Sequence, residues 1–211
     1  MSGTSVLALK VKEGVLVGAD CLASYGSMAR YMGMPRVIKI SEGCLVGGAG
    51  DTGDFQEVQR VLAAEERAAR CEGLGFVPTA RDHFRFLQRT LYKRRNKMDP
   101  LMGDFIVAGP EFIGQVDCWG TPVECKYAAS GYGREIALPI LRDRWSEELT
   151  REEGVKILEH CLKILYFRDA RASSQIQIGF VGKTECVVSP MYELSTEGCW
   201  NIGEVAIHDP K

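Results

Sequence analysis

Thr4 to Asp20 reads TSVLALKVKEGVLVGAD, and this stretch decides the fold. From Thr4 to Val11 alternate residues form two opposite faces, and Glu13-Gly14 then leads into the apolar run Val15 to Ala19. Two extended segments joined by a short polar turn are typical of a β-hairpin. The chain therefore opens with a predicted pair of antiparallel strands.

The same arrangement follows once more, and then the period of the apolar residues changes. Val37 to Ile40 and Cys44 to Ala49 flank a Glu42-Gly43 turn, which predicts a second hairpin. Beyond Asp51 the apolar residues recur at helical spacing, so we expect a helix that ends at Gly73. That helical face consists of Phe55, Val58, Val61 and Leu62.

In the rest of the chain, the predicted helices follow one another in pairs and the predicted strands in groups. A second helix is expected between Pro78-Thr79 and Asp99-Pro100. A third begins after Gly133 with Pro139 inside it, and Thr150 with Glu153 forms a capping-box signal for a fourth. Further strands are predicted at Phe105 to Ala108, Glu111 to Cys118, Glu124 to Ala129, Ile176 to Val181 and Cys186 to Val188.

Segregated blocks of strands and helix pairs favour an α+β domain over alternating βαβ units. Hairpin connections predict antiparallel sheets, and two helix pairs can cover two sheet faces. We therefore expect a four-layer αββα sandwich of two antiparallel sheets between two helix pairs. It forms a single domain over residues 1–194, and residues 195–211 form a C-terminal arm.

Composition narrows the class of protein. The chain has 211 residues with a net charge of −2 and 45% hydrophobic residues, enough for a large buried core. Near-neutral charge gives no support for general binding to nucleic acid or to an anionic membrane. No apolar run approaches the roughly 20 residues that span a bilayer, and Met1 to Lys12 does not resemble a signal peptide. We expect an intracellular protein that binds neither nucleic acid nor membrane.

Two local features are open to a second interpretation. The eight cysteines are scattered without a CxxC pair, which predicts reduced packing residues rather than a redox or metal site. No metal and no cofactor are expected. The basic run Lys93-Arg94-Arg95 with Lys97 is expected to be a solvated or subunit-facing helix end, with contact to RNA or to a localisation receptor as the alternative.

Three segments interrupt apolar strands with glycine and polar residues: Gly3-Thr4-Ser5, Gly18-Ala19-Asp20 and Gly47 to Asp51. The last of them lacks both the Lys-Ser/Thr of a phosphate loop and the GxGxxG spacing. A close turn from strand to helix, capped by Asp51, is the simpler interpretation.

Five motifs in register carry a resemblance over nearly the whole chain. Gly3-Thr4-Ser5 is followed by GVLVGAD (Gly14 to Asp20), GGAGD (Gly47 to Asp51), ASGYG (Ala129 to Gly133) and YFRDA (Tyr166 to Ala170). Together they resemble a proteasome beta-type subunit. The resemblance implies the N-terminal-nucleophile hydrolase fold, which is the same four-layer sandwich.

The resemblance also implies a chemistry and its position. Active members use a threonine exposed by cleavage after a glycine, and the free amine of that threonine serves as the base for its own hydroxyl. The matching position is Thr4, preceded by Gly3. Asp20, Ser130 and Asp169 match the rest of the family pattern.

Three departures argue against catalysis. Active members carry a lysine where this chain has Arg36, and a guanidinium with a pKa above about 12 cannot exchange a proton. Thr4 follows Met1-Ser2-Gly3, so the backbone nitrogen of Thr4 belongs to a peptide bond and cannot act as a base. The family pattern RDAxSG is also incomplete, since Ala172 stands where its serine would fall.

Finer details resemble the noncatalytic seventh beta subunit of a eukaryotic core particle. These are the GTSVL start, Tyr25-Gly26-Ser27, Arg36, and the segments Tyr92 to Met98 and Leu165 to Arg171. The resemblance implies a structural subunit of the cytoplasm and nucleus that assembles with alpha-type and beta-type subunits, and indirectly with assembly chaperones and regulatory caps.

Two alternatives remain at this stage. One is a processed threonine endopeptidase with Thr4 as nucleophile, and the other is a small-molecule amidase on the same fold. The arm after Pro190 favours a ring subunit, because it is too apolar to remain in solvent. We expect it to pack on a neighbouring subunit through Cys199, Trp200, Ile202, Val205 and Ile207.

Overall fold

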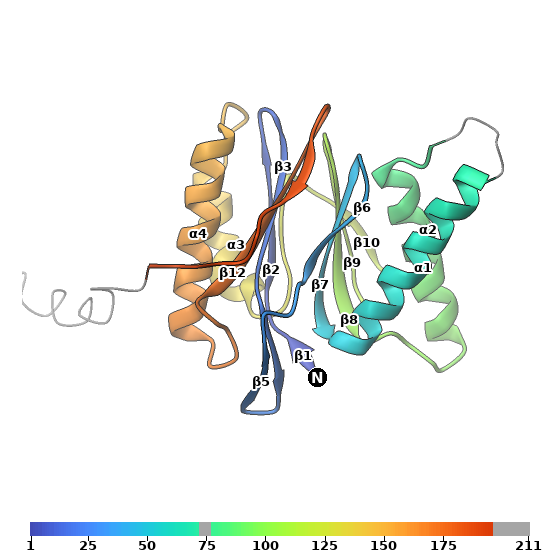
Figure 1. Cartoon of the computed structure of the whole chain (residues 1–211), viewed down its shortest axis with the longest axis horizontal. Coiled ribbons are helices and arrows are strands. Elements are labelled where there is room, and N and C mark those ends of the chain that lie inside the picture. The colour runs from blue at the N-terminus through green and yellow to red at the C-terminus, as the bar shows by residue number, and fades with distance from the viewer. Residues whose placement is uncertain (72–76, 196–211) are drawn as a thin grey trace, which may run out of the picture.

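The computed structural model describes residues 1–71 and 77–195. Two antiparallel sheets lie face to face, and a pair of helices covers the outer face of each (Figure 1). This arrangement confirms the predicted α+β four-layer sandwich. The domain boundary at residue 194 stays a prediction, because the arm apart from Ser195 lies outside the described residues.

The first sheet follows the order β10-β9-β8-β7-β1-β4-β5, with β6 paired to β7 beside this path. Its centre is the long ladder between β7 and β8, from Leu45 opposite Ala108 to Gly50 opposite Gly103. The strands are β1 (Ser2–Gly3), β4 (Leu22–Tyr25), β5 (Met28–Met32), β6 (Val37–Ser41), β7 (Cys44–Asp51), β8 (Gly103–Gly109), β9 (Phe112–Val116) and β10 (Pro122–Glu124).

The second sheet follows the order β11-β2-β3-β12-β13, with β14 also paired to β12. The predicted first hairpin supplies its two central strands, and β3 pairs along its whole length with β12, so that Asp20 faces Ile176. The strands are β2 (Val6–Val11), β3 (Gly14–Asp20), β11 (Tyr127–Ala129), β12 (Gln175–Gly182), β13 (Cys186–Val188) and β14 (Tyr192–Glu193).

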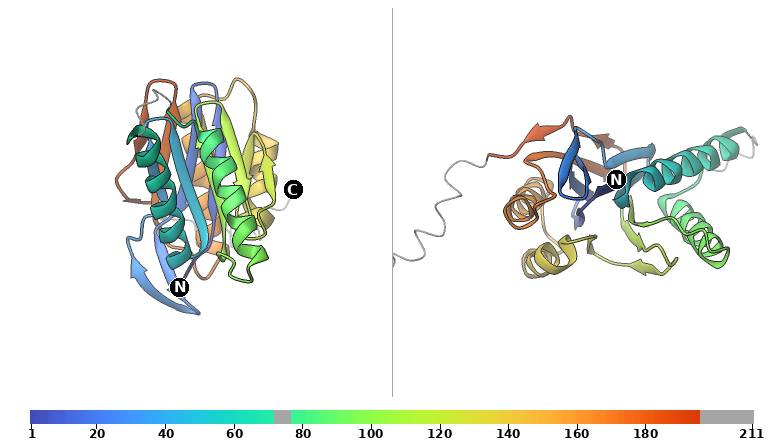
Figure 2. Two further views of the ribbon diagram at one scale, coloured as in Figure 1. Left: turned by 90° about the vertical axis from the view of Figure 1, so that its right-hand side faces the viewer. Right: turned by 90° about the horizontal axis from the view of Figure 1, so that it is seen from below.

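Both predicted helix pairs are present. Helices α1 (Thr52–Cys71) and α2 (Ala80–Asn96) cover the first sheet, whereas α3 (Gly133–Arg144) and α4 (Arg151–Arg168) cover the second (Figure 2). The outer layers are filled by large side chains such as Phe84 and Leu162. Small and β-branched residues such as Val6, Ala8 and Val17 fill the space between the sheets.

Capping explains where two of the helices begin. The Thr150 hydroxyl accepts a hydrogen bond from the Glu153 N–H, and the Glu153 carboxylate accepts one from the Thr150 N–H, which confirms the predicted capping box of α4. Thr79 and Asp82 form a second capping box at α2 that was not predicted. Asp51 caps α1, since its Oδ1 accepts from the backbone of Gly53 and Asp54. The simpler interpretation of the glycine-rich segment is therefore confirmed.

Some strand predictions were wrong. The expected single strand Glu124 to Ala129 divides into β10 and β11, because the chain crosses from one sheet to the other between them. The first strand starts at Val6 instead of Thr4. Strands β1, β4 and β5 were missed, since they are short and, in the case of β5, exposed along their length.

Metal sites, disulfides and membrane-spanning helices are three other features that bear on function. Among residues 1–71 and 77–195, no three metal-ligating side chains gather and no cysteine is paired. No helix in these ranges is long and apolar enough to cross a membrane. Cys199 and the other apolar residues of the predicted arm lie outside the described residues.

The capping box of α4 gives a stability prediction. We expect Thr150→Ala to lower the free energy of unfolding by about 1 kcal/mol, because the Glu153 N–H loses its acceptor and the Glu153 carboxylate loses the hydroxyl that donates to it. The control is Thr184→Ala, at an exposed threonine in the β12–β13 turn. Denaturant unfolding of both variants measures the difference, and equal losses would contradict this role for Thr150.

Candidate functional site

The predicted nucleophile lies in the short crossing between the two sheets. Thr4 follows β1 of the first sheet and precedes β2 of the second, and it is buried. Gly131 packs against its carbonyl with φ near +57°, a conformation in which any Cβ would overlap the Thr4 oxygen. The Thr4 hydroxyl has no hydrogen-bond partner among the described residues.

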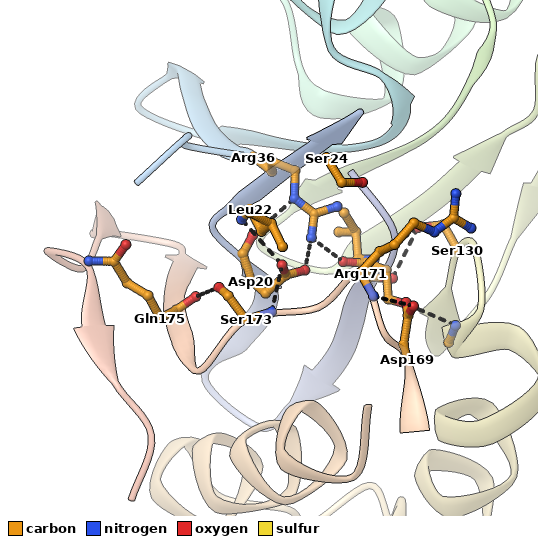
Figure 3. A network of polar contacts seen from close by, with 12 residues as sticks. Asp20, Leu22, Ser24, Arg36, Ser130, Asp169, Arg171, Ser173 and Gln175 are labelled. Carbon is orange, nitrogen blue, oxygen red and sulfur yellow. Dashed lines mark hydrogen bonds and ion pairs between the residues drawn. The ribbon is translucent and has the colours of Figure 1, made fainter. Parts of the chain in front are cut away.

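Asp20 and Arg36 form a buried ion pair at the end of β3 (Figure 3). Arg36 Nη2 donates to Asp20 Oδ1 and also to the Ser5 carbonyl, the latter at 2.9 Å. Arg36 Nε donates to the Asp20 carbonyl at 2.9 Å. Three bonds therefore hold the guanidinium on Asp20 and Ser5, whereas Nη1 has no partner among the described residues.

Groups around Asp20 shift the pKa of its carboxyl in opposite directions. Burial raises the pKa of the Asp20 carboxyl, and the nearby Asp169 carboxylate raises it further. The Arg36 guanidinium and the N–H groups of Leu22 and Ser173 favour the ionised form and offset part of this rise, so the pKa of Asp20 stays above its usual value. The Asp20 carboxylate therefore depends on Arg36 for most of its compensation in a dry environment.

Asp169 and Ser130 form hydrogen bonds with the backbone near Asp20 and Thr4. Asp169 is buried at the C-terminal end of α4, where its Oδ1 accepts from the Arg171 N–H at 2.9 Å and its Oδ2 has no partner in the described part of the chain. The Ser130 hydroxyl accepts from the Val6 N–H at 3.0 Å and donates to the Val6 carbonyl. Both side chains therefore fix backbone segments that flank Thr4 and Asp20.

A pocket of about 370 Å³ opens beside Thr4. Arg171, Tyr132 and Cys118 are among the residues that line it. Burial, with Asp117 and Asp104 nearby, raises the pKa of the Cys118 thiol, so it is a weak nucleophile at neutral pH. Thr4 also lines this pocket, and no described residue hydrogen-bonds to its hydroxyl.

The residues before Thr4 are part of the first sheet. Ser2 pairs with Asp51 of β7 and with Ser24 of β4, and Gly3 pairs with Gly50. The Ser24 hydroxyl also donates to the Ser2 carbonyl at 3.1 Å. Strand β1 thus fills the space between β4 and β7 with the chain's own backbone.

Gly3 is in direct contact with the ion pair. A Cβ at this position would lie 2.6 Å from Arg36 Nη1 and 2.9 Å from its Cζ. The guanidinium cannot move aside without losing its bonds to Asp20 and Ser5. In this fold Gly3 is therefore required by packing, independently of any cleavage after it.

Of the five predicted positions, the structure joins Asp20 and Arg36 directly and places Asp169 close enough to influence Asp20. Ser130 lies beside Gly131, which touches Thr4. The structure shows no hydrogen bond from Arg36 to Thr4. Sequence reasoning missed the Ser5 carbonyl and the Ser173 N–H, because backbone groups leave no signal in residue identity.

The comparisons with known proteins agree with this geometry. Residues 1–181 match the family of proteasome subunits. Proteasome subunit beta type-4 of Arabidopsis thaliana is 36% identical over 93% of this chain and 81% of its own length. Proteasome subunit beta type-7 of Saccharomyces cerevisiae is 32% identical over 87% and 74%. Proteasome subunit beta 2 of Thermococcus gammatolerans is 32% identical over 80% of this chain and 84% of its own length.

Two sheets between two helix pairs, with a threonine where the chain passes between the sheets, define a protein of the N-terminal-nucleophile hydrolase fold. The family match covers residues 1–181, and the relatives are 32–36% identical over most of the chain. The chain belongs to the proteasome subunit family.

The contact between Gly3 and Arg36 can be tested by a double-mutant cycle. We expect Gly3→Ala to lower the free energy of unfolding by about 1–3 kcal/mol, because the added methyl overlaps the fixed guanidinium. In an Arg36→Ala background the same change should cost less, since alanine has none of the side-chain atoms that the methyl would meet, namely Arg36 Cδ, Nη1 and Cζ. Denaturant unfolding of the four proteins gives the coupling, and additive losses would contradict the contact.

The ion pair predicts a dependence on pH. Arg36→Ala leaves Asp20 buried without its cation, so we expect a loss of about 3–5 kcal/mol at pH 7. Without Arg36 the folded-state pKa of Asp20 should rise further above the unfolded value than it does in wild type, so the variant's folded state takes up more protons and its stability rises more as pH falls. Unfolding measured from pH 7 to pH 5 should show the gap to wild type narrowing. An unchanged gap would contradict the role of the pair.

Proposed function

We propose that this chain is a noncatalytic structural beta subunit of the proteasome core particle. In this role it occupies one place in the beta ring, helps to enclose the degradation chamber and joins half-particles, while other subunits carry out the peptide hydrolysis. The particle works in the cytoplasm and nucleus in ATP- and ubiquitin-dependent degradation, with chaperones and regulatory caps as indirect partners.

The observation that carries the proposal is the engagement of Arg36. The resemblance places a lysine there in active subunits, beside the threonine. Here the side chain is a guanidinium whose hydrogen bonds go to Asp20 and Ser5, and none of them reaches Thr4. A group that neither exchanges a proton nor bonds to the hydroxyl cannot activate it.

The position of β1 supports the same proposal. An extended peptide binds to a sheet by adding a strand, and the space between β4 and β7 beside Thr4 offers such a place. Ser2 and Gly3 already fill it through pairing with Ser24, Gly50 and Asp51. A substrate would have to displace a paired strand before it could reach the Thr4 hydroxyl.

The alternative is a processed threonine endopeptidase with Thr4 as nucleophile. The presence of the Gly3-Thr4 sequence and of Asp20, Ser130 and Asp169 favours it, as does the position of Thr4 in the wall of a pocket. The two functions differ in one chemical respect, since only the peptidase needs a free amine on Thr4.

A reagent that needs that amine distinguishes them. The native assembly is treated with an electrophile that closes a ring with the hydroxyl and amine of an N-terminal threonine, and adducts are mapped by mass spectrometry. We expect adducts on partner subunits and an intact Gly3-Thr4 bond in this chain. The labelled partners are the positive control, and an adduct on Thr4 would establish the peptidase instead.

A further inference from the structure

The pocket beside Thr4 is present with the N-terminal segment in place. Its volume of about 370 Å³ lies at the lower end of the range of small-molecule sites. Ser2 and Gly3 are among its lining residues, so the pocket exists while β1 is paired and while Thr4 is bonded to Gly3. We call this cavity the Thr4 pocket. A ligand can therefore enter it without any cleavage of the chain.

Arg171 gives the Thr4 pocket a positive charge. Among the described residues, the charged side chains that line it are those of Asp104 and Arg171. Asp104 is paired with Arg134 at 2.9 Å, whereas the Arg171 guanidinium forms no ion pair with any residue that the structure describes. The Arg171 side chain is exposed and extends away from the buried pair of Asp20 and Arg36 (Figure 3). The pocket therefore favours a ligand with one negative charge.

The turn that carries Arg171 is held by Asp169. Asp169 Oδ1 accepts from the Arg171 N–H at 2.9 Å, and the Asp169 carbonyl accepts from the Ala172 N–H at 3.1 Å. Asp169 itself is buried at the end of α4. Because the backbone of Arg171 is already fixed, less conformational entropy is lost when its side chain binds a ligand.

The Thr4 hydroxyl is a second polar group available to a ligand. Thr4 is only 8% exposed, and its Oγ1 has no hydrogen-bond partner among the described residues. A buried hydroxyl without a partner is unfavourable, and a ligand oxygen that accepts its hydrogen bond removes that cost. Thr4 and Arg171 line the same pocket, and a carboxylate has two oxygens that accept from such donors.

Two exposed apolar side chains lie in the same wall. Met102 is 58% exposed and Tyr132 is 51% exposed, and both line the Thr4 pocket. Apolar surface of this kind gains free energy when a ligand covers it. A methionine adapts to contacts of different shape, and a tyrosine ring packs well against another ring. The matching ligand therefore carries an apolar or aromatic group beside its negative charge.

We propose that the Thr4 pocket binds the carboxyl-terminal residue of a peptide whose last side chain is apolar or aromatic. The carboxylate bonds to the Arg171 guanidinium and to the Thr4 hydroxyl, and the last side chain packs on Met102 and Tyr132. No covalent bond is formed or broken. A carboxylate is preferred to a phosphate, because Asp104 in the same wall repels a second negative charge.

The source of such peptides rests on the proposed function. Subunits that hydrolyse peptide bonds release a new carboxyl terminus with each cleavage, and a noncatalytic neighbour holds that product without cutting it. The binding itself depends only on residues of this chain. The pocket therefore affects how long products stay in the chamber and not how fast they are formed.

The test uses the native particle after its reactive threonines have been blocked by the ring-forming electrophile described above. The probe is acetyl-dialanyl-4-benzoylphenylalanine, which crosslinks to neighbouring C–H bonds under light, and the matched control is the same peptide with a carboxamide end. Adducts are mapped by mass spectrometry. We expect the acid to label Met102 or Tyr132 about tenfold more than the amide does, because the amide lacks the charge that Arg171 attracts.

Substitutions in an affinity-tagged copy of this chain identify the groups responsible. Arg171→Gln removes the charge, so acid and amide should label this variant equally. The matched control is Arg142→Gln, at an exposed arginine of α3 outside the pocket, which should keep the tenfold preference. Thr4→Val has a similar volume without the hydroxyl, and labelling by the acid should fall about fivefold. Entry of each tagged variant into the particle shows that it is folded.

The outcomes separate the binding proposal from the proposed function. Equal labelling of wild type by acid and amide, or an unchanged preference in Arg171→Gln, would overturn the binding proposal. If the electrophile itself is found on Thr4, or the chain is absent from the particle, the proposed function fails instead. In that case the same crosslinking on the full-length chain alone decides the binding, and absence of the acid preference there refutes it.

Discussion

The buried pair of Asp20 and Arg36 is the interaction on which the two-sheet arrangement depends at its functional end. Asp20 ends β3 in the second sheet, whereas the carbonyl of Arg36 accepts a hydrogen bond from Gly48 of β7 in the first. Through the Ser5 carbonyl the same guanidinium holds the crossing that contains Thr4. One side chain thereby links both sheets and the segment between them.

Burying two charges is costly unless they are paired and hydrogen-bonded, and this site satisfies most of that requirement. Asp20 receives the guanidinium and two backbone N–H groups, and Arg36 places its remaining bonds on carbonyls. The arrangement restricts its neighbours, since Gly3 must stay without a side chain. A residue that resembles part of a cleavage motif thus has a structural reason to be glycine.

The framework of the site consists of side chains that bond to the backbone. The Ser130 hydroxyl bonds to both the N–H and the carbonyl of Val6, and Asp169 accepts from the Arg171 N–H. The proposed noncatalytic role depends on two other features, the Arg36 guanidinium on Asp20 and the strand before Thr4. Both bear on the same requirement, because a threonine hydroxyl attacks only when a base can take its proton.

Much of the fold was predictable from sequence because it rests on local patterns. Alternation in Val6 to Val11, helical spacing from Phe55 and the pair Thr150 and Glu153 each express an interaction between residues close in the chain. The division of Glu124 to Ala129 between two sheets was not predictable in this way. It depends on Tyr127 pairing with Leu9, more than a hundred residues away.

The candidate site, too, was only partly predictable from the sequence. The family motifs identified Thr4, Asp20, Arg36, Ser130 and Asp169, but not the direction in which the arginine points or the carbonyls that receive it. The positive charge of α2 is visible in its sequence, whereas the pairing of Arg81 and Arg85 with Glu124 and the position of Arg95 beside two aromatic rings are not. By itself the sequence determined the layers, the helix starts and the identity of the site residues, because these follow from neighbouring residues and periodicity. Only the tertiary structure decided which charges are paired and which backbone fills the space beside Thr4, because those depend on contacts between segments distant in the chain.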